Sequence, residues 1–478
     1  MKKLVTLLLA AGMVFSAANG ASAVDMKVSG VWMTSFTFAD NLFNDTDLVK
    51  DAGNDGSFNA AQRIRINFDM VASEYVSGRV QLEAANGGNA DGKNPGQYHT
   101  WGTSGTGGTG KAVTARLAYL DWLVPSTDVL VRMGRQEVAM PSYTFNSPVF
   151  DGSIDGVLVN APVTEMVDVT FGWLRPNATV NKWDEAHTPH SSADLAYLSV
   201  DVNADGFKVT PWGMIGLVGS KAAMTDEVKD VTTGEVTTKA SANLDMFGTY
   251  DSKIDARTTV YWVGLGGELT MFDPFKFTAD FMYSGNNADG VAERHGWYAA
   301  LGAEMKMSFA TPFLKGWYAS GDDADSEDSN RFMSINGGGT FNASSIYFDA
   351  NGLLAATIDN CNAAGTWGVQ LGVKNVSFVE DLTHALSVTY FQGTNNTNRV
   401  YTGYAPTRDF GPSRYMTTAD SAWSIDFLSS YKLYENLTAN LLLAYLVTDY
   451  DEKVWEKAWG DVKFDNAFRG TLNFTYAF

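Results

Sequence analysis

The chain has 478 residues and a formal net charge of -20 at pH 7, with 13% aromatic residues, 46 glycines and one cysteine. The acidic balance disfavours nucleic acid as a partner, and the lone Cys361 excludes an internal disulfide framework. A single domain of this length needs a special architecture, because ordinary hydrophobic cores stop growing at smaller sizes.

The first residues indicate export from the cytoplasm. The segment "MKKLVTLLLAAGMVFSAANGASA" combines a basic start at Lys2 and Lys3, an apolar stretch and a closing A-x-A motif. This arrangement is typical of a secretory signal peptide and is too short for a membrane-spanning helix. We therefore expect residues 1–23 to be a signal peptide and residues 24–478 to form a single domain.

The remaining chain alternates polar and apolar residues in long segments. In "RIRINFDM", residues 63–70, the alternation has no exception, and "GRVQLE" continues it after a short turn. A period of two sorts side chains onto the two faces of a strand, whereas a helix would scatter them. Similar hairpins recur, with short turns at 203–206, 273–274, 311–312, 380–381 and 435–436.

Long polar connections alternate with these short turns. One opening strand, eight hairpins and one closing strand predict about 18 strands, with 16 as the alternative. A soluble β-sandwich or β-helix also explains the alternation, but not the strand length, the one-sided long loops or the aromatic residues near strand ends. These aromatic residues are Tyr261, Trp262, Trp297, Tyr298, Trp317, Tyr318, Trp367 and Trp423.

The sequence therefore predicts an all-β chain that forms a closed antiparallel transmembrane β-barrel. Short turns would face the periplasm and long loops the outside. The closing strand "FRGTLNFTYAF" fits this prediction, because it carries Phe474, Tyr476 and Phe478 on one face and Arg469 and Thr471 on the other. Such a strand would pair with the first one, so that no edge stays open in lipid.

Motifs for catalysis or cofactor binding are weak. "GTGGTGKA" resembles a phosphate-binding loop, but Ala112 stands where Ser or Thr should hold Mg²⁺, and a strand follows it instead of a helix. "HTPH" lacks the further ligand and base of a zinc site, and "GDDADSEDSN" lacks the glycine and final glutamate of a calcium loop. We expect no enzyme activity, no cofactor and no metal site.

The informative charges are basic residues within the strands, because arginine on a half-apolar strand must face water. The alternation of inward and outward positions places these arginines on a shared inner face in three of four strands. In "TARLAYLDW", the same parity would turn Asp121 outward. The arginines predicted to line the pore are Arg63, Arg65, Arg79, Arg116 and Arg132.

Through "ARLAYLDWL", "VRMGRQ" and "NFTYAF", the chain resembles the trimeric general-diffusion porins of Gram-negative outer membranes, and most closely the homotrimeric porins of sulfate-reducing bacteria. The resemblance implies that the third long loop, within 137–156, folds into the barrel and faces the arginines with Glu137, Asp151 and Asp155. General porins have 16 strands, so the count of 18 departs from that pattern.

The resemblance also implies partners. Arg135 would contact the 87–110 loop of a neighbouring subunit in a homotrimer. Phe474, Tyr476 and Phe478 would form the signal read by the barrel-assembly machinery. The other expected partners are outer-membrane lipid, lipopolysaccharide, ions and small hydrophilic solutes.

Two functions follow from these expectations. The first is an outer-membrane porin whose water-filled pore passes ions and small hydrophilic solutes by passive diffusion. The alternative is a substrate-selective outer-membrane channel for sugars or organic acids, with an outer-membrane enzyme as a distant third.

Overall fold

The computed structural model describes residues 24–41, 56–84, 99–100, 113–178, 192–219, 228–229, 236–238, 257–288, 293–324, 328–335, 341–348, 363–401, 412, 415–459 and 462–478. The predicted signal peptide and nearly all of the 87–110 loop lie outside these residues. No helix among the described residues is long and apolar enough to cross a membrane.

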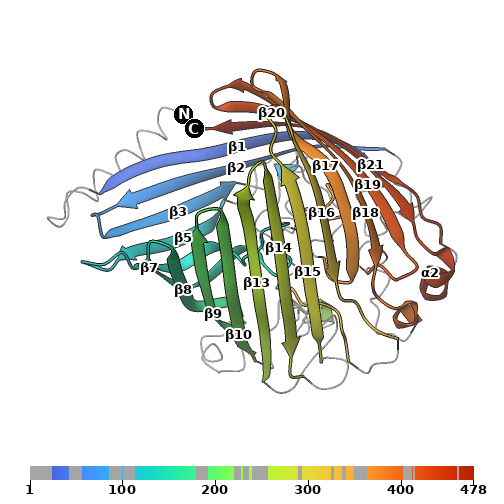
Figure 1. Cartoon of the computed structure of the whole chain (residues 1–478), viewed down its shortest axis with the longest axis horizontal. Coiled ribbons are helices and arrows are strands. Elements are labelled where there is room, and N and C mark those ends of the chain that lie inside the picture. Colours follow the sequence, from blue (N-terminus) through green and yellow to red (C-terminus); the bar gives the residue numbers. More distant parts are fainter. Residues whose placement is uncertain are drawn as a thin grey trace.

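The wall of the molecule is a single antiparallel sheet that closes on itself (Figure 1). The sheet contains 19 strands, of which β4 (His99–Thr100) has only two residues, so that 18 strands build the wall. This confirms the predicted count. The wall strands are β1 (Asp25–Asp40), β2 (Ser57–Val71), β3 (Val76–Ala84), β5 (Val113–Leu123), β6 (Leu130–Ala139), β7 (Asp151–Thr164), β8 (Val167–Ala178), β9 (Ser192–Ala204), β10 (Phe207–Val218), β13 (Thr258–Phe272), β14 (Phe275–Asn286), β15 (His295–Met305), β16 (Thr311–Ala319), β17 (Thr366–Val379), β18 (Leu382–Gly393), β19 (Ser421–Tyr434), β20 (Leu437–Asp449) and β21 (Ala467–Ala477).

The last strand closes the barrel by pairing with the first. β21 runs antiparallel to β1, from Val31↔Ala477 to Asp40↔Phe468. Beyond this ladder, the Gly30 amide donates to the Phe478 carbonyl at 2.7 Å, and the Phe478 amide donates back at 3.0 Å. The terminal residue therefore takes part in the closure, and no strand edge remains there for lipid to meet.

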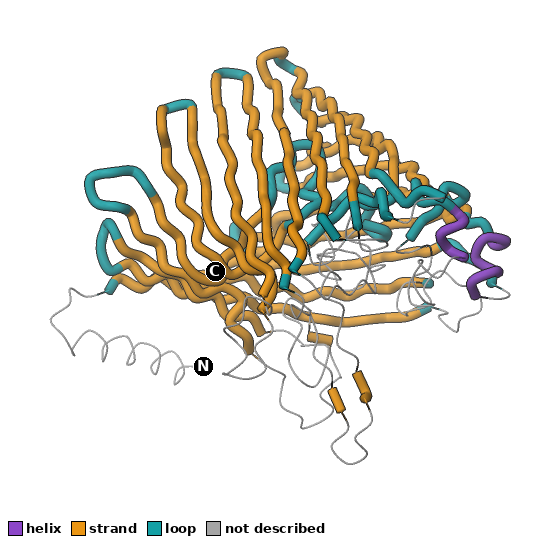
Figure 2. The backbone as a smooth tube through the Cα atoms, turned by 90° about the horizontal axis from the view of Figure 1, so that it is seen from below, coloured by secondary structure: helices purple, strands orange, loops and turns teal. Residues whose placement is uncertain are grey.

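Short turns join neighbouring strands at one end of the barrel, and the strand ends that lead into long connections lie at the other (Figure 2). Two short strands, β11 (Val228–Lys229) and β12 (Val236–Thr238), pair with each other within one long connection. Helices η3 (Thr397–Tyr401) and α2 (Glu452–Trp459) lie in two others. The last residue, Phe478, pairs with Gly30 in the first half of β1, and the C mark lies beside that strand (Figure 1).

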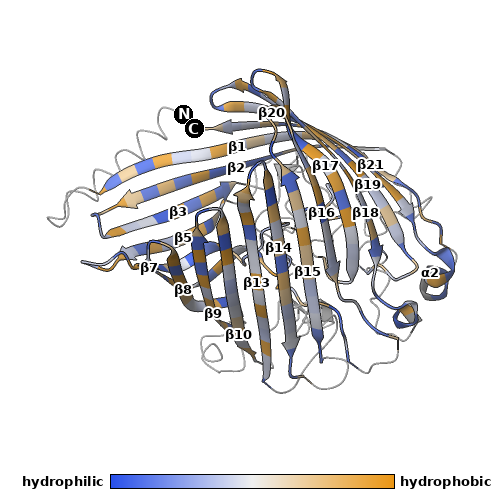
Figure 3. Ribbon diagram, in the orientation of Figure 1, coloured by the Kyte–Doolittle hydropathy of each residue, from blue (hydrophilic) through white to orange (hydrophobic). Residues whose placement is uncertain are grey.

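The two faces of each strand differ as the alternation predicts, and Figure 3 shows apolar and polar residues following one another along the strands. On β21, Arg469 and Asn473 are fully buried, whereas Leu472 is 40% exposed, and Phe478, which follows the strand, is 46% exposed. Because a barrel has only an inside and an outside, the polar residues face inward and the apolar residues outward.

The aromatic residues divide between the two faces, which corrects part of the expectation. Trp297 and Tyr318 stack on the outer face with ring centroids 4.6 Å apart. Trp262, Tyr298 and Trp317 instead face inward and are almost completely buried. They belong to an apolar core inside the barrel, which two inward-folded loops create.

Candidate functional site

The arginines predicted to line the pore lie on the inner face of the wall, and most pair with acids of a neighbouring strand. Arg65 and Glu83 are cross-strand partners, with Arg65 Nε 2.6 Å from Glu83 Oε2. Arg79 and Asp69 are partners in the same ladder, with Arg79 Nε 2.5 Å from Asp69 Oδ1. Arg63 follows on the same face of β2. The sequence did not reveal these acidic partners, because register decides which residues meet.

A bulge in β5 lets Arg116 and Asp121 both face inward. The β3–β5 register shifts between Gln81 and Leu82, so β5 accommodates one extra residue. Strict alternation would have turned Asp121 outward. Instead, Asp121 Oδ1 accepts from Arg132 Nε at 2.7 Å, and Arg116 Nη1 donates to the inward Gln81 Oε1 at 2.9 Å.

The β6–β7 hairpin separates from β5 towards its tip. β5–β6 pairing ends at Ala118↔Arg135, whereas β6–β7 pairing continues to Ala139↔Asp151. Gly134 has a φ of 124°, and a Cβ there would lie 2.3 Å from the Ala118 carbonyl oxygen. Only glycine tolerates both conditions, so Gly134 permits the bend at which the strands part.

Glu137, beyond this bend, contacts the arginine wall. Its Oε1 accepts from Arg116 Nη2 at 2.6 Å, and the Glu137 side chain is 55% exposed. Arg65 also lies near enough to act electrostatically on this carboxylate. The hairpin therefore brings one carboxylate to a group of guanidinium ions in contact with water.

The acids assigned to the constriction loop lie on strands, which corrects that expectation. Glu137 belongs to β6, and Asp151 and Asp155 belong to β7. The loop itself spans 140–150 and contains no acid. Strands β6 and β7 extend this far because the hydrogen bonds between them satisfy backbone N–H and C=O groups that would lack a partner in a loop. Asp155 lies on the outer face, 3.4 Å from Arg135 Nη1, rather than facing the pore arginines.

The 140–150 loop folds inward and is bound to the opposite wall. Asp280 of β14 accepts from the backbone amides of Tyr143 and Thr144, each at 2.8 Å. Lys315 Nζ of β16 donates to the Thr144 carbonyl at 2.8 Å. Burial raises the pKa of the Tyr143 hydroxyl, which hydrogen-bonds to the Thr210 hydroxyl at 2.6 Å.

A second segment, residues 341–348 between β16 and β17, also lies inside the barrel. Asp426 accepts from the Ser345 amide at 2.8 Å, and Arg469 Nη1 donates to the Ser345 carbonyl at 2.9 Å. Gln370 Nε2 donates to the Ala343 carbonyl at 2.9 Å. This inward segment was not predicted, although an apolar run such as "FNASSIYF" within a long connection is a signal of burial.

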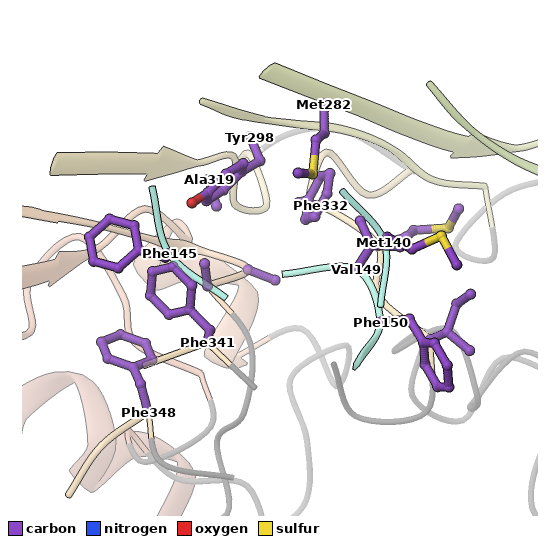
Figure 4. Packing of buried hydrophobic residues seen from close by; sticks show 14 of the residues in the cluster. Met140, Phe145, Val149, Phe150, Met282, Tyr298, Ala319, Phe332, Phe341 and Phe348 are labelled. Atoms are coloured by element: carbon purple, nitrogen blue, oxygen red, sulfur yellow. The ribbon is translucent and has the colours of Figure 1, made fainter. Parts of the chain in front are cut away.

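The two loops pack against each other (Figure 4). The Phe145 and Phe341 ring centroids are 4.9 Å apart, and the Asn146 backbone N–H donates to Asn342 Oδ1 at 3.2 Å. Asn146 and Asn342 are the exposed residues of 140–150 and 341–348. The joined loops thus present two amide side chains to water and bury their aromatic side chains.

Lysines and glutamates alternate on the inner face of the wall that holds the first loop. Lys276 pairs with Glu268 at 2.5 Å, and Lys374 pairs with Glu304 at 2.7 Å. Lys315 lies 3.9 Å from the same Glu304. Charges of both signs therefore lie on the arginine wall and also on the inner face of β13–β17. The inner surface can thus bind a solute through charge-assisted hydrogen bonds.

The described residues contain no group of three or more His, Cys, Asp or Glu side chains able to hold a metal ion. The site consists instead of arginines, lysines, carboxylates and amides around a narrowed interior. Such groups orient and select polar solutes.

No protein-family model matches the chain, and no curated protein sequence matches it. The fold does match crystal structures from Pseudomonas aeruginosa. OpdQ shares 11% identity at a TM-score of 0.51, over 95% of this chain and 98% of OpdQ. OccK9 (OpdG) shares 12% at 0.52, over 95% and 99% of the two chains.

OccK2 (OpdF), solved in complex with glucuronate, shares 12% identity at a TM-score of 0.51, over 95% of this chain and 98% of OccK2. At these identities the likeness establishes a shared barrel fold. None of these three structures comes from a sulfate-reducing bacterium, so that part of the resemblance stays a prediction.

Proposed function

We propose that this chain is a substrate-selective channel in the outer membrane of a Gram-negative bacterium, and that it prefers small solutes that carry a carboxylate. The observation that carries this proposal is the row of guanidinium groups on the inner face, which reaches Glu137 on the inward hairpin through Arg116. Arginine binds carboxylates through two parallel hydrogen bonds, which favours this solute class.

The narrowing of the interior supports selectivity. Two loops are bound to the wall through the buried carboxylates of Asp280 and Asp426. A solute that passes these loops meets the exposed residues Asn146 and Asn342 and the arginine wall, whose Arg116 reaches Glu137 on the inward hairpin. Close passage makes specific contacts count more than size alone.

The matched folds support the same class of channel. One of them, OccK2, was solved in complex with glucuronate, a sugar acid. A molecule of this kind carries a carboxylate for guanidinium groups and hydroxyls for amides. This support comes from the shared fold, at 12% identity to OccK2.

A general-diffusion pore is the second candidate. The observation that favours it is the near balance of charge, since the five pore-wall arginines stand among four carboxylates. These carboxylates are Asp69, Glu83, Asp121 and Glu137. A balanced wall attracts neither ion class strongly.

Liposome swelling separates the two candidates. We expect uptake of glucuronate to exceed that of glucose, which is similar in size, and to saturate with concentration. Rates that fall only with solute size, without saturation, would favour the general-diffusion pore.

We further propose that the chain forms a homotrimer and reaches the membrane through the barrel-assembly machinery, which would read Phe474, Tyr476 and Phe478. Closed oligomers with a threefold axis bury the same patch on each copy. The native mass of detergent-solubilised protein tests this proposal, and a single-chain mass would refute the trimer.

A further inference from the structure

Four charged residues form a row on the outer face of the barrel, across strands β6 to β9. Asp155 is the cross-strand partner of both Arg135 and Arg175. Arg135 Nη1 lies 3.4 Å from Asp155 Oδ2, and Arg175 Nε lies 2.7 Å from Asp194 Oδ1. The charges along the row therefore alternate in sign from strand to strand.

This row points away from the pore. Trp173, two positions before Arg175 on β8 and so on the same face, is 42% exposed, while the intervening Leu174 is completely buried. On β6, Gln136 is 1% exposed on the inner side next to Arg135. In a membrane-inserted barrel, the outward face of these strands meets lipid.

The row lies near the strand ends that lead into long connections. Arg175 is close to the end of β8 at Ala178, and Asp194 is close to the start of β9 at Ser192. An arginine on the lipid face costs roughly 2–4 kcal/mol at the bilayer midplane but about 0–1 kcal/mol near an interface. The position is therefore that of the headgroup layer, with Trp173 and Phe171 below it as interfacial and apolar anchors.

The Arg175 side chain is held in one orientation through Nε, while its two terminal nitrogens remain available for another partner. Asp194 accepts from Arg175 Nε, from Trp173 Nε1 at 2.8 Å and from Ser192 Oγ at 2.6 Å. The Arg175 guanidinium carbon also lies 4.8 Å from the centre of the Trp173 ring. Within the described ranges, the terminal nitrogens of Arg175 have no hydrogen-bond acceptor, and the side chain is 39% exposed.

The Arg135 guanidinium is also available to bind an anion. Its side chain is 36% exposed, and its contact with Asp155 is long for a charge-assisted hydrogen bond. Arg135 and Arg175 lie two strands apart, about 10 Å at the usual strand spacing. Two separately presented guanidinium groups at headgroup depth match the chemistry of a phosphorylated lipid.

We propose that Arg135 and Arg175 bind the phosphate groups of a phosphorylated glycolipid in the outer leaflet. Asp194 and Trp173 act as positioning residues for Arg175, and Asp155 is the counter-charge that phosphate displaces from Arg135. The proposal rests on the proposed function, because it requires a barrel inserted in an outer membrane. It differs from the subunit contact that the sequence resemblance assigns to Arg135, and a second copy of the chain is the competing occupant.

The test measures binding of lipid A, a phosphorylated glycolipid, to the detergent-purified full chain by native mass spectrometry. We expect the Arg135→Gln, Arg175→Gln double variant to bind lipid A about tenfold or more weakly, the scale of losing charge-assisted hydrogen bonds. The matched control is the Lys306→Gln, Lys432→Gln double variant, which removes the same charge at exposed positions of the short-turn end. The control should bind as the wild type does, and enzymatically dephosphorylated lipid A should bind both double variants equally.

Unchanged lipid A affinity in the arginine variant, or an equal loss in the lysine control, would overturn the proposal. Loss of an oligomer with unchanged lipid affinity would assign the row to a second copy. Planar-bilayer conductance of the same samples separates this test from the proposed function. A wild type without channel activity would contradict the channel itself, whereas normal conductance with unchanged lipid binding would contradict only the lipid site.

Discussion

Arg116 and Glu137 form an ion pair of 2.6 Å across the point where β5 and β6 part. Arg116 occupies a bulge of the wall, and Glu137 belongs to a hairpin that continues after its pairing with β5 has ended. The pair therefore joins the arginine wall to the hairpin that carries the inward 140–150 loop. Opposite charges at a narrow section control which ions enter it.

The first prediction concerns selectivity between small cations and anions, which is separate from the preference for carboxylate-bearing solutes. We expect this ion selectivity to be weak, with a cation preference at low salt that shrinks or reverses as salt screens the acidic loops. Arg116→Ala should shift the reversal potential in a salt gradient towards cations, and Glu137→Ala towards anions. Asp155→Ala is the control, because Asp155 lies on the outer face and should leave the reversal potential unchanged. Identical potentials in all variants would show that the constriction lies elsewhere.

The second prediction concerns the bend at Gly134. Gly134→Ala should destabilise the folded barrel by about 1–3 kcal/mol, because it combines a backbone clash with a left-handed φ. Urea titration of the folded fraction, followed by heat-modifiable mobility on gels, measures this effect. Gly213→Ala is the matched control, since its nearest contact would be an unstrained 3.8 Å. Equal stability of the two variants would mean that the strands do not need glycine at this bend.

The third prediction concerns the anchoring of the inward loop. Asp280→Ala should leave two backbone amides without their carboxylate and loosen the loop that they hold. We expect higher single-channel conductance and more open-channel noise. Asp128→Ala, on an exposed short turn, serves as the control and should behave as the wild type does. A quiet channel of unchanged conductance in Asp280→Ala would argue against this anchor.

The fourth prediction concerns barrel closure. Phe478 exchanges two backbone hydrogen bonds with Gly30, and its side chain is 46% exposed on the outer face. Phe478→Asp would place a charge where lipid is expected, so export should persist while membrane assembly is impaired. Cell fractionation with a test for heat-modifiable mobility measures this. Normal assembly of the variant would contradict the role given to the terminal strand.

The fold was predictable because its signal is local. In a membrane barrel, adjacent residues of one strand meet water and lipid in turn, so "RIRINFDM" and "NFTYAF" reveal strand and face without knowledge of their partners. The hairpin turns then set the number of strands. Register does not follow from this pattern, which is why the pairing of Arg65 with Glu83 was not predicted.

The candidate site was predicted only in part, because its shape depends on exceptions to the alternation. The bulge at Arg116 reverses the facing expected for Asp121, and the hairpin ladder keeps Asp151 on a strand rather than in the loop. The 341–348 segment is bound inside by strands distant in sequence, including β19 through Asp426. Such long-range contacts leave little trace in the spacing of residues.

The most direct test of the proposed function is single-channel recording with glucuronate added to one side of a planar bilayer. We predict concentration-dependent, saturable interruption of the ionic current, which glucose does not produce. Arg65→Ala with Arg116→Ala should weaken this effect about tenfold or more, since two guanidinium partners of the carboxylate are lost. A current that responds equally to glucuronate and glucose, in wild type and variant alike, would contradict a carboxylate-selective channel.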